Sequence, residues 1–179
     1  TIDQGTTSSR CIIFAKDGSV VSSAQYGFKQ HYPNNGWVEH ASQDILDTVV
    51  KACRQCLADS GLQAEQINCV GITNQRETTL VWDHKTGDAI YPAIVWQDRR
   101  TAKMCQELKQ AGHEELVTAR TGLLLDPYFS ATKLSWILDH VQGSRERAEV
   151  GELLFGTVDT YLMWHLSQGQ IFATDATDA

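Results

Sequence analysis

Apolar residues fall in short runs near the start of the chain and take a helical spacing further on. Residues 10–15 are nearly all apolar or β-prone, which is typical of a strand buried on both faces. The pair Asp17-Gly18 follows and favours a tight turn, so residues 20–28 are predicted to return as a second strand. The first predicted element is therefore a β-hairpin.

Residues 43–60 have the clearest helical pattern, because apolar side chains recur there every three or four positions. Ser42 is placed to cap the start of this helix and Gly61 its end. Further strands are predicted at 67–73, 93–96, 150–155 and 170–173, a hairpin at 85–87, and helices at 98–111, 128–141 and 157–167. Strands that pair first and then alternate with helices indicate a mixed α/β sheet with helices packed on it.

Composition narrows the class of protein. The 179 residues suffice for one domain with a hydrophobic core. A net charge of −7 argues against a nucleic-acid surface, which is normally basic. We expect no membrane insertion, because no apolar run approaches the roughly 18 residues that a bilayer requires. Five cysteines without zinc spacing fit a reducing cytoplasm, and Cys53 and Cys56 are interpreted as core residues.

A polar segment between the first apolar residues and the first long strand is a candidate phosphate site. Gly5 allows close approach of the backbone to a phosphate, and successive N–H groups can form an anion-binding concavity. Asp3 could hold Mg²⁺ through water. The candidate donors to phosphate are Thr6, Thr7, Ser8 and Arg10. The alternative is an ordinary polar turn.

Four later residues, in three segments of the chain, are candidates for binding a polyol. Arg76 and Glu77 directly follow an apolar strand and offer donors and acceptors suited to adjacent hydroxyls, although a surface ion pair is the alternative. Trp96 also ends a strand and is either an apolar wall or a core residue. Tyr128 stands at the entrance of a predicted helix and is either a ligand-binding residue or a half-buried aromatic.

Four strings in this order, DQGTTSSR, ITNQRETT, IVWQDRRT and YFSATKLSWILDHV, resemble the FGGY family of sugar kinases. NQRETT is similar to the branch that phosphorylates glycerol, and LFGTVDTYLMW extends the resemblance over essentially the whole chain. The resemblance implies an actin-like ATPase fold, with a ribonuclease-H-like mixed sheet and helices on both faces. It also implies ATP- and Mg²⁺-dependent conversion of glycerol to sn-glycerol 3-phosphate.

Roles for single residues follow from the same resemblance. The nucleotide phosphates are expected to contact Thr6, Thr7, Ser8 and Arg10, and Mg²⁺ is expected near Asp3. The glycerol hydroxyls are expected to bind Arg76, Glu77 and Tyr128, and the glycerol carbon chain is expected to lie along Trp96. A cytoplasmic location and a homo-oligomer at full length are also expected.

The sequence departs from the family's pattern in three places. Only Thr1 and Ile2 precede DQGTT, where the family has several apolar residues, so we expect a stable form to carry more residues or to pair with another chain. Ala41-Ser42 stands where the family commonly has an acidic residue and Pro. The aspartate that acts as general base belongs to a later GDQ motif. Residues 1–179 are thus interpreted as an incomplete N-terminal domain without the nucleotide domain, inactive by itself.

Other functions remain possible on sequence grounds. Xylulose and gluconate kinases of the same family share the DxGT and W-x-D-x-R strings. A truncated module that binds a polyol or phosphate without catalysis is a second alternative. An actin- or chaperone-like ATPase is a third, but such a protein needs neither NQRETT nor Trp96.

Overall fold

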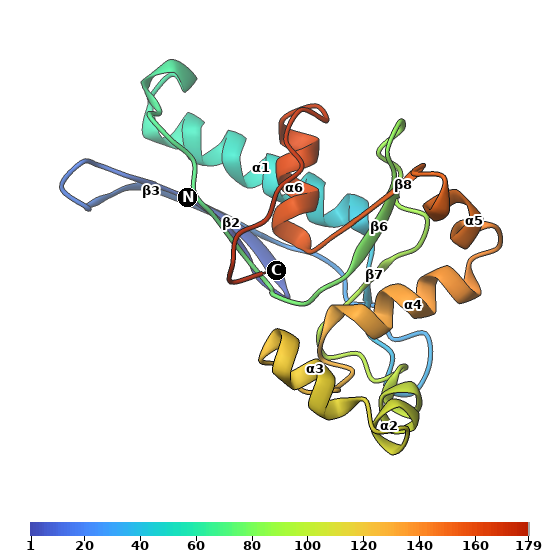
Figure 1. Cartoon of the computed structure of the whole chain (residues 1–179). Helices are drawn as coiled ribbons and strands as arrows, with labels where there is room; N and C mark the ends of the chain where they lie inside the picture. The colour runs from blue at the N-terminus through green and yellow to red at the C-terminus, as the bar shows by residue number, and fades with distance from the viewer. Residues whose placement is uncertain (179) are drawn as a thin grey trace.

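The computed structural model describes residues 1–178, and its centre is a four-stranded sheet in the order β3-β2-β1-β5 (Figure 1). Its strands are β1 (Ile2–Gln4), β2 (Ser8–Phe14), β3 (Val20–Gly27) and β5 (Ile72–Asn74). β1 is antiparallel to β2 and parallel to β5, so the predicted hairpin and the mixed sheet are both confirmed. β1 is central, with a partner strand on each edge.

Helices α1 (Ser42–Ser60) and α6 (Val158–Leu166) pack on the face of this sheet that carries Ile2. The main core joins them to the sheet through Ile2, Ile45, Val49, Leu80, Trp82, Ala93, Val158, Tyr161 and Leu162. The apolar spacing predicted for 43–60 is what places Ile45 and Val49 on this face, where both side chains are fully or almost fully buried.

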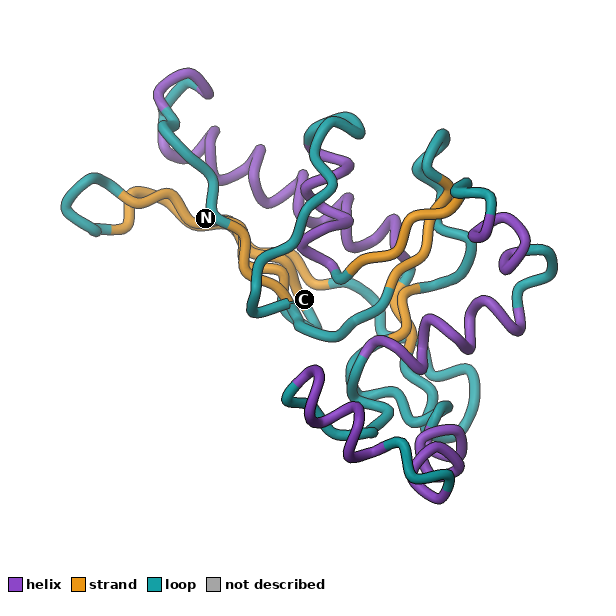
Figure 2. The backbone as a smooth tube through the Cα atoms, viewed as in Figure 1, coloured by secondary structure: helices purple, strands orange, loops and turns teal. Residues whose placement is uncertain are grey.

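A second group of elements extends from the end of the sheet (Figure 2). Two short antiparallel pairs form part of it: β4 (Glu39–His40) with β7 (Ala93–Ile94), and β6 (Leu80–Asp83) with β8 (Leu153–Gly156). The remaining helices are η1 (Ala64–Gln66), α2 (Ala102–Gln110), α3 (Glu114–Thr121), α4 (Ser130–His140) and α5 (Ser144–Glu149). Among residues 1–178, no helix combines the length and apolarity that crossing a bilayer requires.

Two predicted strands are wrong in part or whole. Of residues 67–73, only Ile72 and Thr73 lie in β5, and Val70 is 62% exposed. Pairing between β1 and β5 begins at Ile2, so the earlier residues lie outside the ladder. Residues 170–173 form no strand, because the chain turns at the end of α6, where the N–H of Ile171 donates to Ser167 Oγ at 2.9 Å.

Helix ends differ from the predictions for local reasons. Ser42 is the first helical residue and does not cap α1, whose N-cap is Ala41, whereas Gly61 ends the helix in the left-handed conformation (φ 70°) as predicted. The helix predicted at 98–111 begins only at Ala102. The Asp98 carboxylate accepts from the N–H of Arg100 at 2.8 Å, and this local bond competes with a helical start.

Candidate functional site

The phosphate-loop candidate and the polyol candidates meet at one place. The indole Nε1 of Trp96 donates to Thr6 Oγ1 at 3.0 Å. The Trp96 ring also meets the ring of Tyr128 edge-on, with centroids 5.8 Å apart and an interplanar angle of 64°. The β1–β2 turn, the strand end after β7 and the entrance of α4 therefore converge, although their residues lie far apart in the sequence.

Glu77 takes an uncommon backbone conformation beside them. Its φ is 64°, in the left-handed region that few non-glycine residues adopt. Ser130 Oγ donates to Glu77 Oε2 at 2.7 Å, and the buried ammonium of Lys133 donates to the Glu77 carbonyl at 2.9 Å. The same ammonium donates to the carbonyl of Tyr128. These contacts fix Glu77 against the start of α4.

Arg76 is placed differently from its neighbour. Its side chain is exposed, and it is close enough to Asp175 and Asp178 for its positive charge to act on both carboxyl groups. Hydrogen bonds from Thr177 hold the pKa of Asp175 below its ordinary value, and the positive charge of Arg76 adds to this effect. The structure therefore gathers Thr6, Glu77, Trp96 and Tyr128, whereas Arg76 faces the carboxylates of the C-terminal segment.

The other phosphate-site candidates lie on the sheet face opposite to Ile2. Asp3 pairs with Arg10 across β1 and β2, and Arg10 pairs with Gln25 on β3. Gln25 accepts from Arg10 Nε at 3.2 Å and donates to Ser8 Oγ at 2.6 Å. The turn between the strands is closed by the N–H of Gly5, which donates to the Ser8 carbonyl at 2.9 Å.

The sheet face that carries Asp3, together with the β1–β2 turn, presents hydroxyl oxygens around one carboxylate, and such oxygens can bind a metal ion directly or through water. Thr7 is exposed at the turn, and Asp3 is half-buried. In the part of the chain that the structure describes, no group of three or more His, Cys, Asp or Glu residues could hold a metal ion directly. A single carboxylate suits Mg²⁺, which keeps most of its water shell when bound to proteins. The donor set therefore fits that ion held through water.

A buried polar network, which the sequence reasoning missed, lies under the turn. Gln30 Nε2 donates to the Thr6 carbonyl at 2.9 Å, so Gln30 Oε1 is left to accept from His40 Nε2 at 2.5 Å. Gln75 Nε2 then donates to the unprotonated His40 Nδ1 at 3.3 Å and to Gln4 Oε1 at 3.0 Å. These roles require a neutral His40, and burial lowers the pKa of His40 to about 4.

The same network continues to the strand end that carries Trp96. Thr78 Oγ1 donates to Gln75 Oε1 at 3.1 Å and accepts from the N–H of Trp96 at 3.4 Å. Trp96 is consequently tied to the turn twice, directly through Thr6 and indirectly through Thr78, Gln75 and the buried imidazole. Such a closed set of hydrogen bonds favours one arrangement of the two loops.

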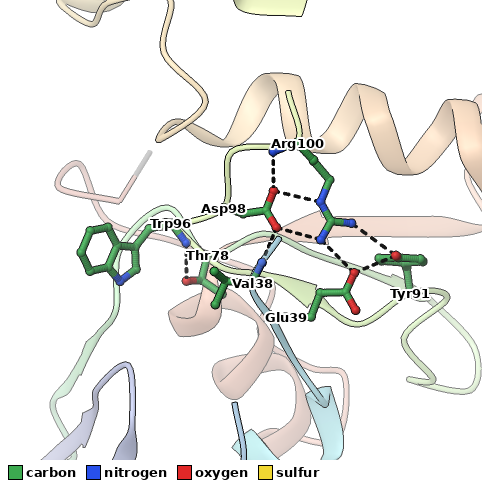
Figure 3. Close-up of polar contacts among 7 residues, drawn as sticks. All are labelled: Val38, Glu39, Thr78, Tyr91, Trp96, Asp98 and Arg100. Atoms are coloured by element: carbon green, nitrogen blue, oxygen red, sulfur yellow. Dashed lines mark hydrogen bonds and ion pairs between the residues drawn. The ribbon is translucent and has the colours of Figure 1, made fainter. Parts of the chain in front are cut away.

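Arg100 makes a second buried cluster next to the site (Figure 3). Its guanidinium donates to both Asp98 carboxylate oxygens at 2.9 and 2.8 Å, to Glu39 Oε1 at 2.8 Å and to the Tyr91 hydroxyl at 3.2 Å. Asp98 Oδ2 also accepts from the N–H of Val38 at 2.6 Å. Figure 3 shows the Trp96 indole pointing away from this cluster, so Asp98 and Arg100 hold β4 while Trp96 contacts Thr6 and Tyr128.

An apolar cavity of about 890 Å³ also reaches Glu77. It is lined by Ser130, Phe129 and Phe155 among others, but neither Trp96 nor Tyr128 contributes to its lining. Glu77 is thus the candidate polyol residue that this cavity shares with the cluster around Trp96.

A mixed sheet with a polar β1–β2 turn in contact with polar and aromatic residues at strand ends is the arrangement expected of a sugar kinase domain. The chain belongs to the FGGY family of carbohydrate kinases, since the family's N-terminal domain pattern matches residues 1–179. Glycerol kinases are prominent among its relatives. It is 63% identical over 178 residues to glycerol kinase 1 of Pseudomonas aeruginosa and 61% identical to the glycerol kinase of Bradyrhizobium sp. (strain ORS 278). Both alignments cover 99% of this chain and 36% of the relative.

Solved structures agree with the predicted fold. The glycerol kinase of Plasmodium falciparum with ADP superposes with a TM-score of 0.88 at 30% identity, covering 94% of this chain and 34% of the other. A xylulose kinase from Rhodospirillum rubrum, at 22% identity and a TM-score of 0.76, shows the same fold. The predicted actin-like fold is confirmed, and the chain spans about a third of the length of its curated relatives.

Proposed function

We propose that this chain is the part of an ATP-dependent glycerol kinase that carries the phosphate loop and most of the glycerol pocket. The contacts of Trp96 with Thr6 of the phosphate loop and with the Tyr128 ring support the proposal most strongly. The names of its glycerol kinase relatives support glycerol as the substrate, and the ADP in the Plasmodium falciparum structure supports the nucleotide. The proposal includes a cytoplasmic location, because the five free cysteines fit a reducing compartment.

In this proposal the pocket holds glycerol by shape and by charge-assisted hydrogen bonds. The Trp96 and Tyr128 rings, set edge to face, form an apolar wall for the carbon chain. The carboxylate of Glu77 accepts from glycerol hydroxyls, and the exposed guanidinium of Arg76 next to it donates to them. The tyrosine hydroxyl provides a further polar contact.

The phosphates of ATP would contact the loop residues Thr6, Thr7, Ser8 and Arg10. Asp3 would lie beside a water-bound Mg²⁺, which would neutralise phosphate charge. Phosphoryl transfer depends mainly on positioning and on electrostatic stabilisation. The bond between Trp96 and Thr6 supports this requirement, because it sets the polyol wall against the phosphate loop. The general base is proposed to be an aspartate in the remainder of the enzyme.

The test uses a full-length protein, meaning this chain joined to the second part that its relatives carry. Glu77→Gln keeps the size of the side chain but weakens a charge-assisted bond, so kcat/KM for glycerol should fall by about 10- to 100-fold. Arg76→Met should lower it similarly, and Arg54→Met, which removes an exposed arginine on α1, should leave it unchanged. Wild-type values for both pocket variants would remove these residues from the glycerol site.

A further inference from the structure

Lys133 is a buried cation that the proposed reaction does not use. It lies in the first turns of α4, and its side chain is fully buried. Lysine is almost never fully buried without partners. Here the partners are two main-chain carbonyls, those of Glu77 at 2.9 Å and of Tyr128. Both of these residues are proposed to contact glycerol, and they come from different parts of the fold.

The surroundings of Lys133 explain how the charge is tolerated. The groups that face it are Glu77 after β5, Asp98 after β7, Asp126 before α4 and the thiol of Cys105 on α2. Burial lowers the pKa of Lys133 to about 8, and the negative charges around it oppose this shift. Lys133 is therefore mostly charged at neutral pH and becomes neutral in mildly alkaline solution.

The hydrogen bond to Glu77 acts on a backbone that needs support. Glu77 has φ 64°, a conformation that costs energy for a residue with a side chain. The lysine fixes the carbonyl of Glu77, and Ser130 Oγ fixes its carboxylate at 2.7 Å. Both supporting residues lie in the first turn and a half of α4, directly after Tyr128. One helix start thus determines where the Glu77 carboxylate lies relative to the tyrosine ring.

We propose that Lys133 is a positioning residue for the polyol pocket, which joins the main chains of Glu77 and Tyr128 and thereby fixes the spacing of these two side chains. The inference rests on the proposed function, because it assigns the lysine a role in glycerol binding. It predicts a selective effect: loss of the lysine disturbs the glycerol side of the site and leaves the phosphate loop, which Lys133 does not contact, in place.

The experiment compares three variants of the full-length protein in steady-state assays with glycerol and ATP varied in turn. Lys133→Met keeps the length of the side chain but removes every donor, and KM for glycerol should rise at least about tenfold while KM for ATP changes less than about twofold. Ser130→Ala should raise KM for glycerol by a smaller factor. Thr132→Val is the matched control, because Thr132 is on the same helix but bonds to Thr101 and Cys105. It should leave both KM values unchanged.

A second readout needs no variant and keeps the inference testable if Lys133→Met does not fold. In the unmutated protein, KM for glycerol should rise as the pH passes through about 8, since the neutral amine donates more weakly to the two carbonyls. In a folded Lys133→Met protein, KM for glycerol should not rise as the pH passes through about 8. A KM for glycerol that is flat from pH 7 to 9 would contradict the inference.

Other outcomes separate the two proposals. If the unmutated protein phosphorylates glycerol and Lys133→Met raises both KM values equally, or lowers only thermal stability, the lysine is structural and the positioning role is wrong. If the unmutated protein neither binds nor phosphorylates glycerol, the proposed function fails and the positioning role fails with it. A rise confined to glycerol, absent in Thr132→Val, supports the inference.

Discussion

Replacing Arg100 by Met should strongly destabilise the domain. The guanidinium is fully buried and makes four hydrogen bonds, and its removal leaves the carboxylates of Asp98 (1% exposed) and Glu39 (9% exposed) without their cation. The guanidinium carbon also lies 3.9 Å from the centroid of the Trp37 ring and 4.6 Å from that of Trp136. These contacts are lost together with the ion pairs.

The loss of unfolding free energy in Arg100→Met is large because removing one partner of a buried ion pair costs more than forming the pair gains. A buried ion pair adds little net stability, but removing one partner leaves uncompensated charge and costs roughly 3–5 kcal/mol. Methionine retains part of the packing between the two tryptophans, so we expect a loss of about 4 kcal/mol. Since domains are stable by only about 5–15 kcal/mol, this would be a large fraction of the total.

Urea unfolding followed by tryptophan fluorescence measures the loss, because Trp37 and Trp136 flank the cluster. Arg99→Met is the control: this neighbouring side chain is 58% exposed and pairs with Asp126 at 3.4 Å, so its removal should cost less than about 1 kcal/mol. Arg100→Lys should recover only part of the stability, since one ammonium cannot reproduce the guanidinium fork. A loss below about 1 kcal/mol for Arg100→Met would refute the reasoning.

Three further predictions concern the network, the link between the two loops and the isolated chain. The pKa of His40 is about 4 in the folded protein and about 6.5 in an unfolded chain, so the unfolded state binds more protons between these pH values. The free energy of unfolding should therefore fall as the pH drops from about 6.5 to about 4. In unfolding curves measured over this pH range, His40→Gln should reduce the fall by roughly 2–3 kcal/mol. In the full-length protein, Trp96→Phe keeps the aromatic wall but removes the donor to Thr6, and should lower kcat by about 5- to 10-fold with little change in KM for glycerol. Residues 1–179 alone should release ADP in the presence of glycerol at well below about 1 s⁻¹, the low end for kinases.

Each of these predictions has a contrary result. An unchanged pH profile in His40→Gln would mean that the imidazole is charged in the folded protein. A wild-type kcat in Trp96→Phe would separate the polyol wall from the phosphate loop. Glycerol-dependent turnover by the isolated chain near the rates of kinases would place the general base within residues 1–179.

Local patterns were sufficient to predict the hairpin and α1, whereas the candidate site residues were assigned from the family resemblance. The Asp17-Gly18 turn and the spacing of Ile45 and Val49 depend on near neighbours in sequence, and both predictions were confirmed. The strand predicted at 67–73 was mostly wrong because a strand also requires a partner, and pairing with β1 starts only at Ile72. α3 escaped prediction for a related reason, since it buries none of its side chains and so has no apolar stripe.

The supporting residues of the site could not be predicted in the same way. Gln4, Gln30, His40 and Gln75 are polar residues that look solvent-exposed in the sequence, and only the folded chain brings them into one hydrogen-bonded network. Lys133 occupies a position in α4 that sequence alone assigns to packing or solvent. The partners of Lys133 are two main-chain carbonyls, and the network residues bond mainly to side chains that lie far away in the sequence, so neither set of contacts leaves a signal in local sequence.

The most direct test of the central claim is a chimaera in which this chain replaces the matching 178 residues of the Pseudomonas aeruginosa relative. Its kcat/KM would be measured with glycerol and with xylulose under saturating ATP. The account predicts a value for glycerol within about tenfold of the parent enzyme and at least about 100-fold above that for xylulose, a gap of nearly 3 kcal/mol in transition-state binding. A folded chimaera that prefers xylulose, or that binds glycerol without phosphorylating it, would contradict the account.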